Sequence, residues 1–511
     1  MKKLFDKYTL LFLFIGAALI LIETQILRWA RNDGAIPAGI AAGMSVKQML
    51  LVGAVLLLLS VFMVMVFRCR KERRTDLLIA LSIAVFGIII AALSPVLNGY
   101  DEHAHFFKTV ATLDGKMFRY DSYNYPVSQS YITIRDHMLD RWYSGTFAGK
   151  WSRETQYVLA IENGFAQPTY PFYGYLFCAA GLGLGRLLGL SVGFSFLLGR
   201  IFNVLAYAGM VYCALRLLPA SCSKYRSAIT VVSCLPGALF VSSHYTQEGL
   251  VYGLILILAA LFLRMKFGEG AHKKDCILFS VLFLLLVPLK YPYIFLGFLL
   301  FLIPEKNFGF RKSRLYIVIL AAVSILLAFL WFFFVSSQYT EPRVENVQGM
   351  EQLKYMMSHL PGFLLSAVTG FVQSIALYFS DNMRLFGSVF YFSSEAVGVI
   401  FGLCTMLVLC FLCGRYSLKS GERLLIALII VFVILATEAA LYVSYNPVGR
   451  EGFIQGVQGR YFYGLLLFLP LLLPEKLQLA SMPEERKQET AVYSFMVLQI
   501  LWLLFGMTIF I

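Results

Sequence analysis

Charged side chains are scarce in this chain, and the motifs of several large enzyme classes are missing. Asp, Glu, Lys and Arg make up 14% of the 511 residues, whereas hydrophobic residues make up 59%. There is no P-loop, G-x-G-x-x-G, G-x-S-x-G or HExxH motif, so nothing indicates an ATP-driven pump or a related nucleotide, hydrolase or zinc-peptidase chemistry. The nine cysteines lie mostly in apolar segments and do not pair at zinc-site spacing. We therefore expect neither a zinc site nor a structural disulfide.

The apolar residues form runs that recur along the whole chain. A soluble core could not bury so large an apolar fraction, and the mean hydropathy is +0.74. Because runs of this length cross a hydrocarbon core of ~30 Å, we predict an all-α integral membrane protein with about 13 transmembrane helices. The first run lacks a cleavage site, so we expect it to be retained as a span. The expected spans are residues 8–28, 47–67, 77–93, 194–217, 228–243, 249–264, 276–289, 292–303, 314–336, 396–414, 424–445, 460–474 and 492–510.

Basic clusters between the apolar runs predict the orientation. The net charge of +14 comes from short groups of Lys and Arg, such as Arg68–Arg74 and Arg264–Lys274. Such groups mark cytoplasmic loops and do not call for a nucleic-acid partner. For every group to be cytoplasmic, the apolar segments 170–190 and 361–379 must lie along the outer interface or re-enter the membrane. Two long loops, 94–169 and 337–395, then face outside.

The densest group of ionisable residues is Asp101-Glu102-His103-Ala104-His105, at the outer end of the third span. Such groups are costly at a membrane unless they are solvated or used. On a helix, Asp101 and His105 share a face. One carboxylate here could take a proton from an acceptor hydroxyl, and another could hold a metal or orient a phosphate. A solvated helix cap explains the same residues equally well.

Other polar groups are also expected at the outer face. Cations there suit a phosphate, since an arginine fork binds two oxygens at once. Each group has a plainer explanation as well: a polar turn around Glu248, a snorkelling lysine at 290, and an interfacial anchor made of Arg460 and Tyr461. The candidates are Arg200, Glu248, Lys290, Tyr291, Gln458, Arg460 and Tyr461.

Two of these motifs resemble the GT-C superfamily of polyprenyl-phosphate-sugar glycosyltransferases. One resembles the Asp-Glu-x-x-His-Phe motif of protein O-mannosyltransferases and falls on Asp101, Glu102, His105 and Phe106. The other is similar to the Ser-Tyr-Asp-x-Glu-Gly motif of the oligosaccharyltransferase catalytic subunit. It matches at Tyr245, Glu248 and Gly249, whereas Thr246 stands in place of the first acidic residue. That departure argues against a tightly bound metal.

The chain as a whole is similar to a bacterial family within this superfamily that is known only as a domain of unknown function. The resemblance covers roughly residues 77–480, and the hairpin at 1–70 departs from the superfamily pattern. The shared features are the DE-x-x-H start, Tyr170-Pro171-x-x-Gly174, Gly199-Arg200-x-x-Asn203, Lys290-Tyr291-Pro292-Tyr293 and Gly456-x-Gln458-Gly459-Arg460-Tyr461.

The resemblance implies a role for each candidate residue. Asp101 would be the general base, and Glu102 would position the acceptor or the donor; both are predicted to be catalytic. Asp101, Glu102 and Glu248 could also hold a divalent metal, Mg²⁺ or Mn²⁺, although the resemblance does not require one. The residues expected to contact the substrate or the donor phosphate are His105, Arg200, Glu248, Lys290, Tyr291, Gln458, Arg460 and Tyr461.

The sequence thus predicts a GT-C-like glycosyltransferase of the bacterial plasma membrane. It would move a sugar from a polyprenyl-phosphate donor to a cell-surface glycan or a teichoic-acid-type acceptor at the outer face, with membrane lipid as its other partner. The alternatives are a flippase or transporter, which should show repeats or paired broken helices, a glycan polymerase, and a non-catalytic scaffold. The expected regions are an N-terminal hairpin (1–76), a seven-helix module with interfacial helices in loop 94–169 (77–336), and a further long loop with C-terminal spans (337–511).

Overall fold

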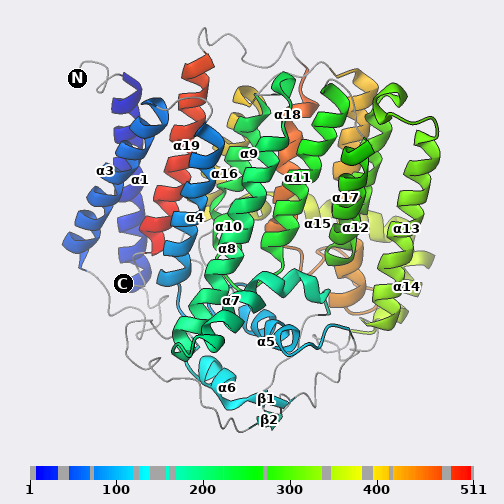
Figure 1. The fold of residues 1–511 in the computed structure, drawn as a ribbon, viewed down its shortest axis with the longest axis horizontal. Helices are drawn as coiled ribbons and strands as arrows, with labels where there is room; N and C mark the ends of the chain where they lie inside the picture. The colour runs from blue at the N-terminus through cyan, green and yellow to red at the C-terminus, as the bar shows by residue number, and fades with distance from the viewer. Residues whose placement is uncertain are drawn as a thin grey trace.

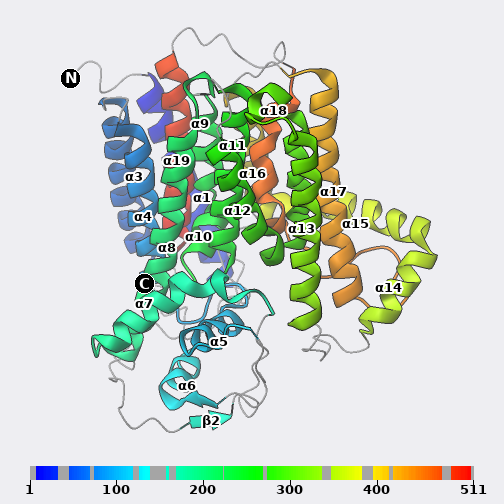
Figure 2. The same cartoon turned by 45° about the vertical axis from the view of Figure 1, so that its right-hand side comes forward.

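The computed structural model shows a bundle of long helices with a layer of shorter elements at one end (Figure 1). The long helices run side by side, while the short elements lie across or beyond their ends (Figure 2). The structure describes residues 7–32, 45–69, 74–118, 126–138, 157–159, 169–222, 224–268, 273–335, 347–381, 395–413, 418–474 and 485–507.

The two ends of the chain pack together at one side of the bundle. Helices α1 (Lys7–Asn32) and α3 (Val46–Cys69) contact each other and the last helix, α19 (Glu485–Met507). Gly53 of α3 allows this close approach, because a side chain there would collide with Ile20 of α1 and Phe505 of α19. The expected N-terminal pair of helices is therefore present, and its partner comes from the far end of the chain.

Three helices form the centre of the bundle: α4 (Thr75–Leu93), α8 (Val192–Leu217) and α11 (Glu248–Phe267). Helix α11 is apolar on every face and almost all of its side chains are buried, as expected for a helix that other helices surround. Gly87 and Gly253 lie where helices meet, against Val204 and Met210 of α8. These contacts fix the depth of α11, and its first residue, Glu248, lies at the end of the bundle that carries the short elements.

Proline shortens or breaks several of the remaining helices. Helices α9 (Tyr225–Ser233) and α10 (Pro236–Ser242) meet at a bend of 60°, because Pro236 has no N–H to continue α9. Pro288 and Pro292 flank the end of α12 (Lys273–Leu289) and the start of η5 (Tyr291–Leu302). The other elements of this part are η4 (Ala220–Cys222), η6 (Glu305–Phe308), α13 (Ser313–Phe334), α14 (Gly349–Ser358), α15 (Leu360–Asp381), α16 (Glu395–Leu412), α17 (Ser420–Tyr445), η8 (Gly459–Tyr461), η9 (Tyr463–Phe468) and α18 (Leu469–Leu472).

Fewer spans are found among the described residues than the sequence predicts. Within the described ranges, seven helices are long and apolar enough to cross a membrane, or up to nine if each of two bent helix pairs is one span. The expectation of about 13 counted every apolar run. Several of those runs fold as short pieces: η5 has 12 residues, and the run at 460–474 divides into η8, η9 and α18. A helical membrane protein is confirmed, and 13 full spans are not.

The first long loop contributes most of the short elements. They include a two-stranded antiparallel sheet in which Val127 pairs with Val158, a small addition to the all-α prediction. Ser128 caps α6 by accepting a hydrogen bond from the backbone of Ser130. The elements are α5 (Glu102–Leu113), β1 (Pro126–Ser128), α6 (Gln129–Asp136), β2 (Tyr157–Leu159), η3 (Phe172–Tyr175) and α7 (Leu176–Leu187). Residues 119–125, 139–156 and 160–168 of this loop, and 336–346 and 382–394 of the later one, lie outside the described residues.

The two ambiguous apolar segments fold differently. Helix α7 has 12 residues, which is about 18 Å at the α-helical rise and too short for the hydrocarbon core. Helices α14 and α15 meet at a bend of 103°, the geometry of a broken span or a re-entrant segment. The interfacial course expected for 170–190 agrees with α7, and the course of 361–379 stays a prediction.

Basic residues gather at the end of the bundle opposite α5, α6 and α7. Ion pairs tie the helix ends together there: Lys266 with Glu422 (2.6 Å), Arg226 with Asp76 (2.6 Å), and Arg264 with Asp275 (3.2 Å). In Figure 2 the starts of α9 and α17 lie at this end, and α5, α6 and α7 lie at the other. The basic clusters predict that this end faces the cytoplasm, and that orientation stays a prediction.

Candidate active site

Glu102 and Arg200 form a closed ion pair beneath the surface of the bundle. Nε of Arg200 donates to Oε1 of Glu102 (2.8 Å) and Nη2 donates to Oε2 (2.6 Å). Both side chains are 0% exposed. Backbone N–H groups of Gly99 (2.9 Å) and Tyr245 (3.0 Å) donate to the same two oxygens. The carboxylate of Glu102 is therefore fully hydrogen-bonded and has no exposed oxygen for a substrate.

Arg200 also holds the turn that leads from α4 to α5. Its Nη1 donates to the carbonyl oxygens of Ala91 (3.0 Å) and Ser94 (2.9 Å), and its Nη2 to that of Pro95 (2.8 Å). These are backbone acceptors that the end of α4 leaves without helical partners. One arginine thus joins the end of α4, the start of α5 and the turn before α11.

The pKa of Glu102 reflects this environment. Burial raises the pKa of Glu102 and is the largest single influence, but the charges of Arg200 and His244 and the hydrogen bonds of Arg200 and Tyr245 together outweigh it. The net result is a pKa below the ordinary value. His244 shows the opposite balance, because burial lowers its pKa to about 4 despite the nearby Glu102. Glu102 is accordingly charged and His244 neutral near pH 7.

Asp101, next to Glu102, points in another direction. Its backbone is left-handed, with φ at 51°, a region that non-glycine residues rarely adopt. Its side chain is 60% exposed, and its Oδ2 lies 3.5 Å from Nη2 of Arg460. The carboxylate of Asp101 is therefore open to solvent and faces Arg460, whereas that of Glu102 is buried.

Two cations and another carboxylate complete this polar cluster, which consists of Asp101, Glu248, Lys290 and Arg460. Oε1 of Glu248 lies 3.4 Å from both Nζ of Lys290 and Nε of Arg460. Burial lowers the pKa of Lys290, and the charge of Glu248 opposes that shift. The cluster joins four segments of the chain, and Glu248, Lys290 and Arg460 are almost wholly buried.

Aromatic rings cover the two cations. Nζ of Lys290 lies 3.8 Å from the centre of the Tyr461 ring, and the guanidinium of Arg460 lies 4.2 Å from that of Tyr100. Such contacts stabilise a cation without using its hydrogen-bond donors. Nε and Nη1 of Arg460 are buried and have no hydrogen-bond partner within the described residues, and the same holds for Oε1 of Gln458. The cluster therefore keeps unused donors beside its carboxylates.

His105 lies one helical turn from Asp101 on α5. Its Nδ1 lies 2.8 Å from the hydroxyl of Tyr175, which in turn donates to Oε1 of Gln247 (3.4 Å). The ring stacks near those of Tyr170 and Tyr175, with centroids 6.1 Å and 5.8 Å away. This chain of contacts links the first external motif to the residue before Glu248.

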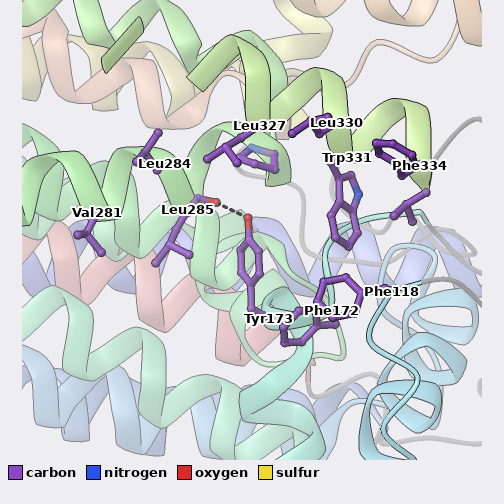
Figure 3. Close-up of a pocket in the computed structure, with 12 residues that line it drawn as sticks. Phe118, Phe172, Tyr173, Val281, Leu284, Leu285, Leu327, Leu330, Trp331 and Phe334 are labelled. Atoms are coloured by element: carbon purple, nitrogen blue, oxygen red, sulfur yellow. Dashed lines mark hydrogen bonds between the residues drawn. The ribbon is translucent and has the colours of Figure 1, made fainter. Parts of the chain in front are cut away.

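An apolar cavity of about 520 Å³ has one wall on α12, the helix that ends just before Lys290. Its walls come from α12, α13 and the segment around η3, with Trp331, Tyr173 and Leu285 facing the space in Figure 3. Tyr173 is fixed by a hydrogen bond from its hydroxyl to the carbonyl of Leu285 (2.8 Å). Burial, followed by the influence of Tyr291, raises the pKa of Tyr173, so Tyr291 lies near this ring. Pro288 lines the cavity two residues before Lys290.

The structure thus sorts the predicted residues. It brings Asp101, Glu248, Lys290, Arg460 and Tyr461 together, places His105 and Gln458 at the edges of this group, and sets Glu102 and Arg200 beneath it. Sequence reasoning missed Tyr100, Tyr175, Gln247 and Tyr252. The hydroxyl of Tyr252 donates to Oε2 of Glu248 (3.0 Å), and the i, i+4 spacing on α11 could have predicted that contact. Tyr175 could be found only from the fold.

The predicted metal ligands do not form a metal site in this arrangement. Both carboxylate oxygens of Glu102 already accept hydrogen bonds from Arg200. Asp101 and Glu248 both face Arg460. In the described part of the chain, no three His, Cys, Asp or Glu side chains are grouped to hold a metal ion. The carboxylates face cationic side chains, so these residues do not fit a divalent ion. The expectation of Mg²⁺ or Mn²⁺ stays an untested prediction.

Comparison with known proteins assigns the central part of the chain to a family. A family model described as a predicted membrane protein (DUF2142) matches residues 84–469. The match begins within α4 and ends at the start of α18, so it includes the polar cluster and leaves out α1, α3 and α19. No curated protein and no solved structure matches the chain.

Proposed function

The chain belongs to the DUF2142 family of predicted membrane proteins, and we propose that it is a glycosyltransferase. It transfers a sugar from a polyprenyl-phosphate donor to a hydroxyl of a cell-surface glycan or teichoic-acid-type acceptor. The observation that carries this proposal is the solvent-open carboxylate of Asp101 beside Arg460, which in turn shares Oε1 of Glu248 with Lys290. Such a group offers a base and two phosphate-binding cations within one site.

The chemistry follows from these positions. The carboxylate of Asp101 takes the proton of the acceptor hydroxyl, and the acceptor oxygen forms a bond to the anomeric carbon of the donor sugar. The bond between that carbon and the phosphate oxygen breaks, and its electron pair leaves with the polyprenyl phosphate. Lys290 and Arg460 stabilise the negative charge that develops on the departing phosphate.

The apolar cavity supports a lipid-linked donor in particular. It is lined by apolar and aromatic side chains of α12 and α13, and several of them, such as Val281 and Phe334, are about half exposed on the outer surface of the bundle. A polyprenyl chain could enter there from the membrane while its phosphate reaches Lys290. A cavity of about 520 Å³ is within the usual range for small-molecule sites and accommodates the first isoprene units rather than the whole chain.

The distribution of charge supports an outward-facing site. The polar cluster lies at the end of the bundle opposite the basic helix ends, and basic ends usually face the cytoplasm. We therefore place the reaction at the outer face of the bacterial plasma membrane, where a cell-surface acceptor is found.

The test is sugar transfer in proteoliposomes with labelled polyprenyl-phosphate sugars and a cell-envelope acceptor extract. Asp101→Asn should keep normal abundance and lose roughly 10²- to 10⁴-fold in rate, the usual contribution of a general base. Asp114→Asn is the matched control, because Asp114 lies at the other end of α5, where its carboxylate is 4.0 Å from Arg186. It should transfer at the wild-type rate.

Two outcomes would contradict the proposal. If no donor is used by folded wild-type protein while a known GT-C enzyme is active in the same assay, the enzyme assignment fails and a transporter or a scaffold gains support. If Asp101→Asn transfers as fast as Asp114→Asn, Asp101 is not the base. Lipid flipping that is lost in Asp101→Asn would favour the flippase alternative.

A further inference from the structure

We propose that Glu248 is a built-in competitor for the donor phosphate, an inference that rests on the proposed function. It holds Lys290 and Arg460 before a donor binds, yields them to the phosphate of the donor, and takes them back when polyprenyl phosphate leaves. Glu248 then governs product release rather than the bond-forming step.

The contacts of Glu248 suit an exchangeable anion. A single oxygen, Oε1, serves both Lys290 and Arg460 at 3.4 Å. The permanent pair beneath it is much tighter, with Arg200 and Glu102 joined by two bonds of 2.6 and 2.8 Å. Charge-assisted bonds usually measure about 2.7–2.9 Å. The cations of the polar cluster are therefore close to Glu248 without being locked to it.

The cations also have capacity to spare. Nε and Nη1 of Arg460 are buried without a hydrogen-bond partner in the described part of the chain, and the side chain is only 8% exposed. Buried donors that lack a partner are costly. A phosphate would satisfy them, because its oxygens can accept from the guanidinium and from the ammonium of Lys290 together.

Charge balance explains why a carboxylate is kept at this position. Asp101 and Glu248 offset Lys290 and Arg460 before a donor binds, so no uncompensated cation is buried there. A donor phosphodiester adds one negative charge. The product is a phosphate monoester, which carries about 1.5 to 2 negative charges near pH 7. Lys290 and Arg460 therefore attract the product, polyprenyl phosphate, more strongly than they attract the donor. The competing carboxylate of Glu248 favours release of that product.

The experiment compares wild type with Glu248→Gln, which keeps the size of the side chain and an acceptor for the hydroxyl of Tyr252. Binding of farnesyl phosphate to the purified full chain in detergent is measured by calorimetry. Removal of a unit charge this close to the anion should tighten binding roughly tenfold or more. Farnesol, which has no phosphate, should bind equally to both proteins. Inorganic phosphate, like farnesyl phosphate, should bind more tightly to Glu248→Gln than to wild type.

A kinetic readout separates release from chemistry. Glu248→Gln should lower the steady-state rate more than the single-turnover rate, so that a burst of the first equivalent of product appears. Glu305→Gln is the matched control, because it removes the same charge from an exposed pair with Arg314. It should show neither tighter binding nor a burst. If Glu248→Gln does not fold, Glu248→Asp, which withdraws the carboxylate from both cations, should show the same changes at smaller size.

The outcomes are distinct for the two proposals. If wild type binds farnesyl phosphate and the Glu248 variants bind it equally or more weakly, the competitor role is overturned and the proposed function stands. If farnesol binding tightens as much as phosphate binding, charge is not the cause and the role is again overturned. If neither protein binds any phosphate, the donor site and the competitor role fail together.

Discussion

The buried pair of Glu102 and Arg200 permits the most quantitative prediction. In Glu102→Gln the amide can accept at one atom only, so its NH₂ group must face two donors, from Arg200 and from the backbone of Gly99 or Tyr245. Arg200 keeps its three carbonyl acceptors but loses its counter-charge. Breaking a buried pair in this way costs about 3–5 kcal/mol, and the remaining acceptors favour the lower part of that range.

The assay is thermal unfolding of the purified protein in detergent, followed by a helical signal. Glu305→Gln is the matched control, because its pair with Arg314 is exposed, with side chains 63% and 48% accessible. An exposed pair contributes about 0–1 kcal/mol. Glu102→Gln should therefore unfold at a clearly lower temperature than both wild type and the control. Equal midpoints for the two variants would refute the conclusion that Glu102 is a structural anchor of the turn.

Two further predictions concern pH and the cavity. Because Arg200 holds the pKa of Glu102 below its ordinary value, the stability from this pair is present above the ordinary carboxyl pKa of about 4.3 and is lost as the pH falls below it. The unfolding free energy of wild type should therefore fall more steeply with decreasing pH than that of Glu102→Gln, and parallel pH profiles for the two proteins would contradict the assignment. Leu284→Trp fills part of the apolar cavity. It should raise the apparent KM for a long-chain polyprenyl-phosphate sugar several-fold more than the apparent KM for a short-chain analogue. An equal rise in KM for both donors would place the lipid chain elsewhere.

The two carboxylates of the Asp-Glu pair show where sequence reasoning stopped. Adjacent residues of one motif are both predicted to be catalytic, because the motif shows their order and not their directions. In the structure Glu102 is 0% exposed and Asp101 is 60% exposed. The left-handed backbone at Asp101 separates their side chains. No composition or spacing rule predicts that turn, since it depends on Arg200, 99 positions after Asp101 in the chain.

The prediction of a possible metal site also depends on side-chain directions that the sequence does not show. Three acidic residues near one membrane face could hold an ion if they converged, and the sequence shows only that they share that face. Each carboxylate instead faces a guanidinium or an ammonium from another segment of the chain. The choice between a metal and a cationic side chain depends on the packing of α8, α12 and η8 around α5 and α11.

The sequence by itself determined that this is a helical membrane protein and which connecting segments carry the basic clusters. These properties follow from local apolar runs and charges, because the hydrocarbon core selects for both along the chain. It also identified all four members of the polar cluster, since ionisable groups are conspicuous in an apolar sequence. Only the tertiary structure decided which carboxylate is open and which is locked, that Glu248 lies between Lys290 and Arg460, and that an apolar cavity forms between α12, α13 and the segment around η3. Those features depend on contacts between residues up to 359 positions apart, such as Asp101 and Arg460, and distances of a few ångströms between helices are set by packing alone.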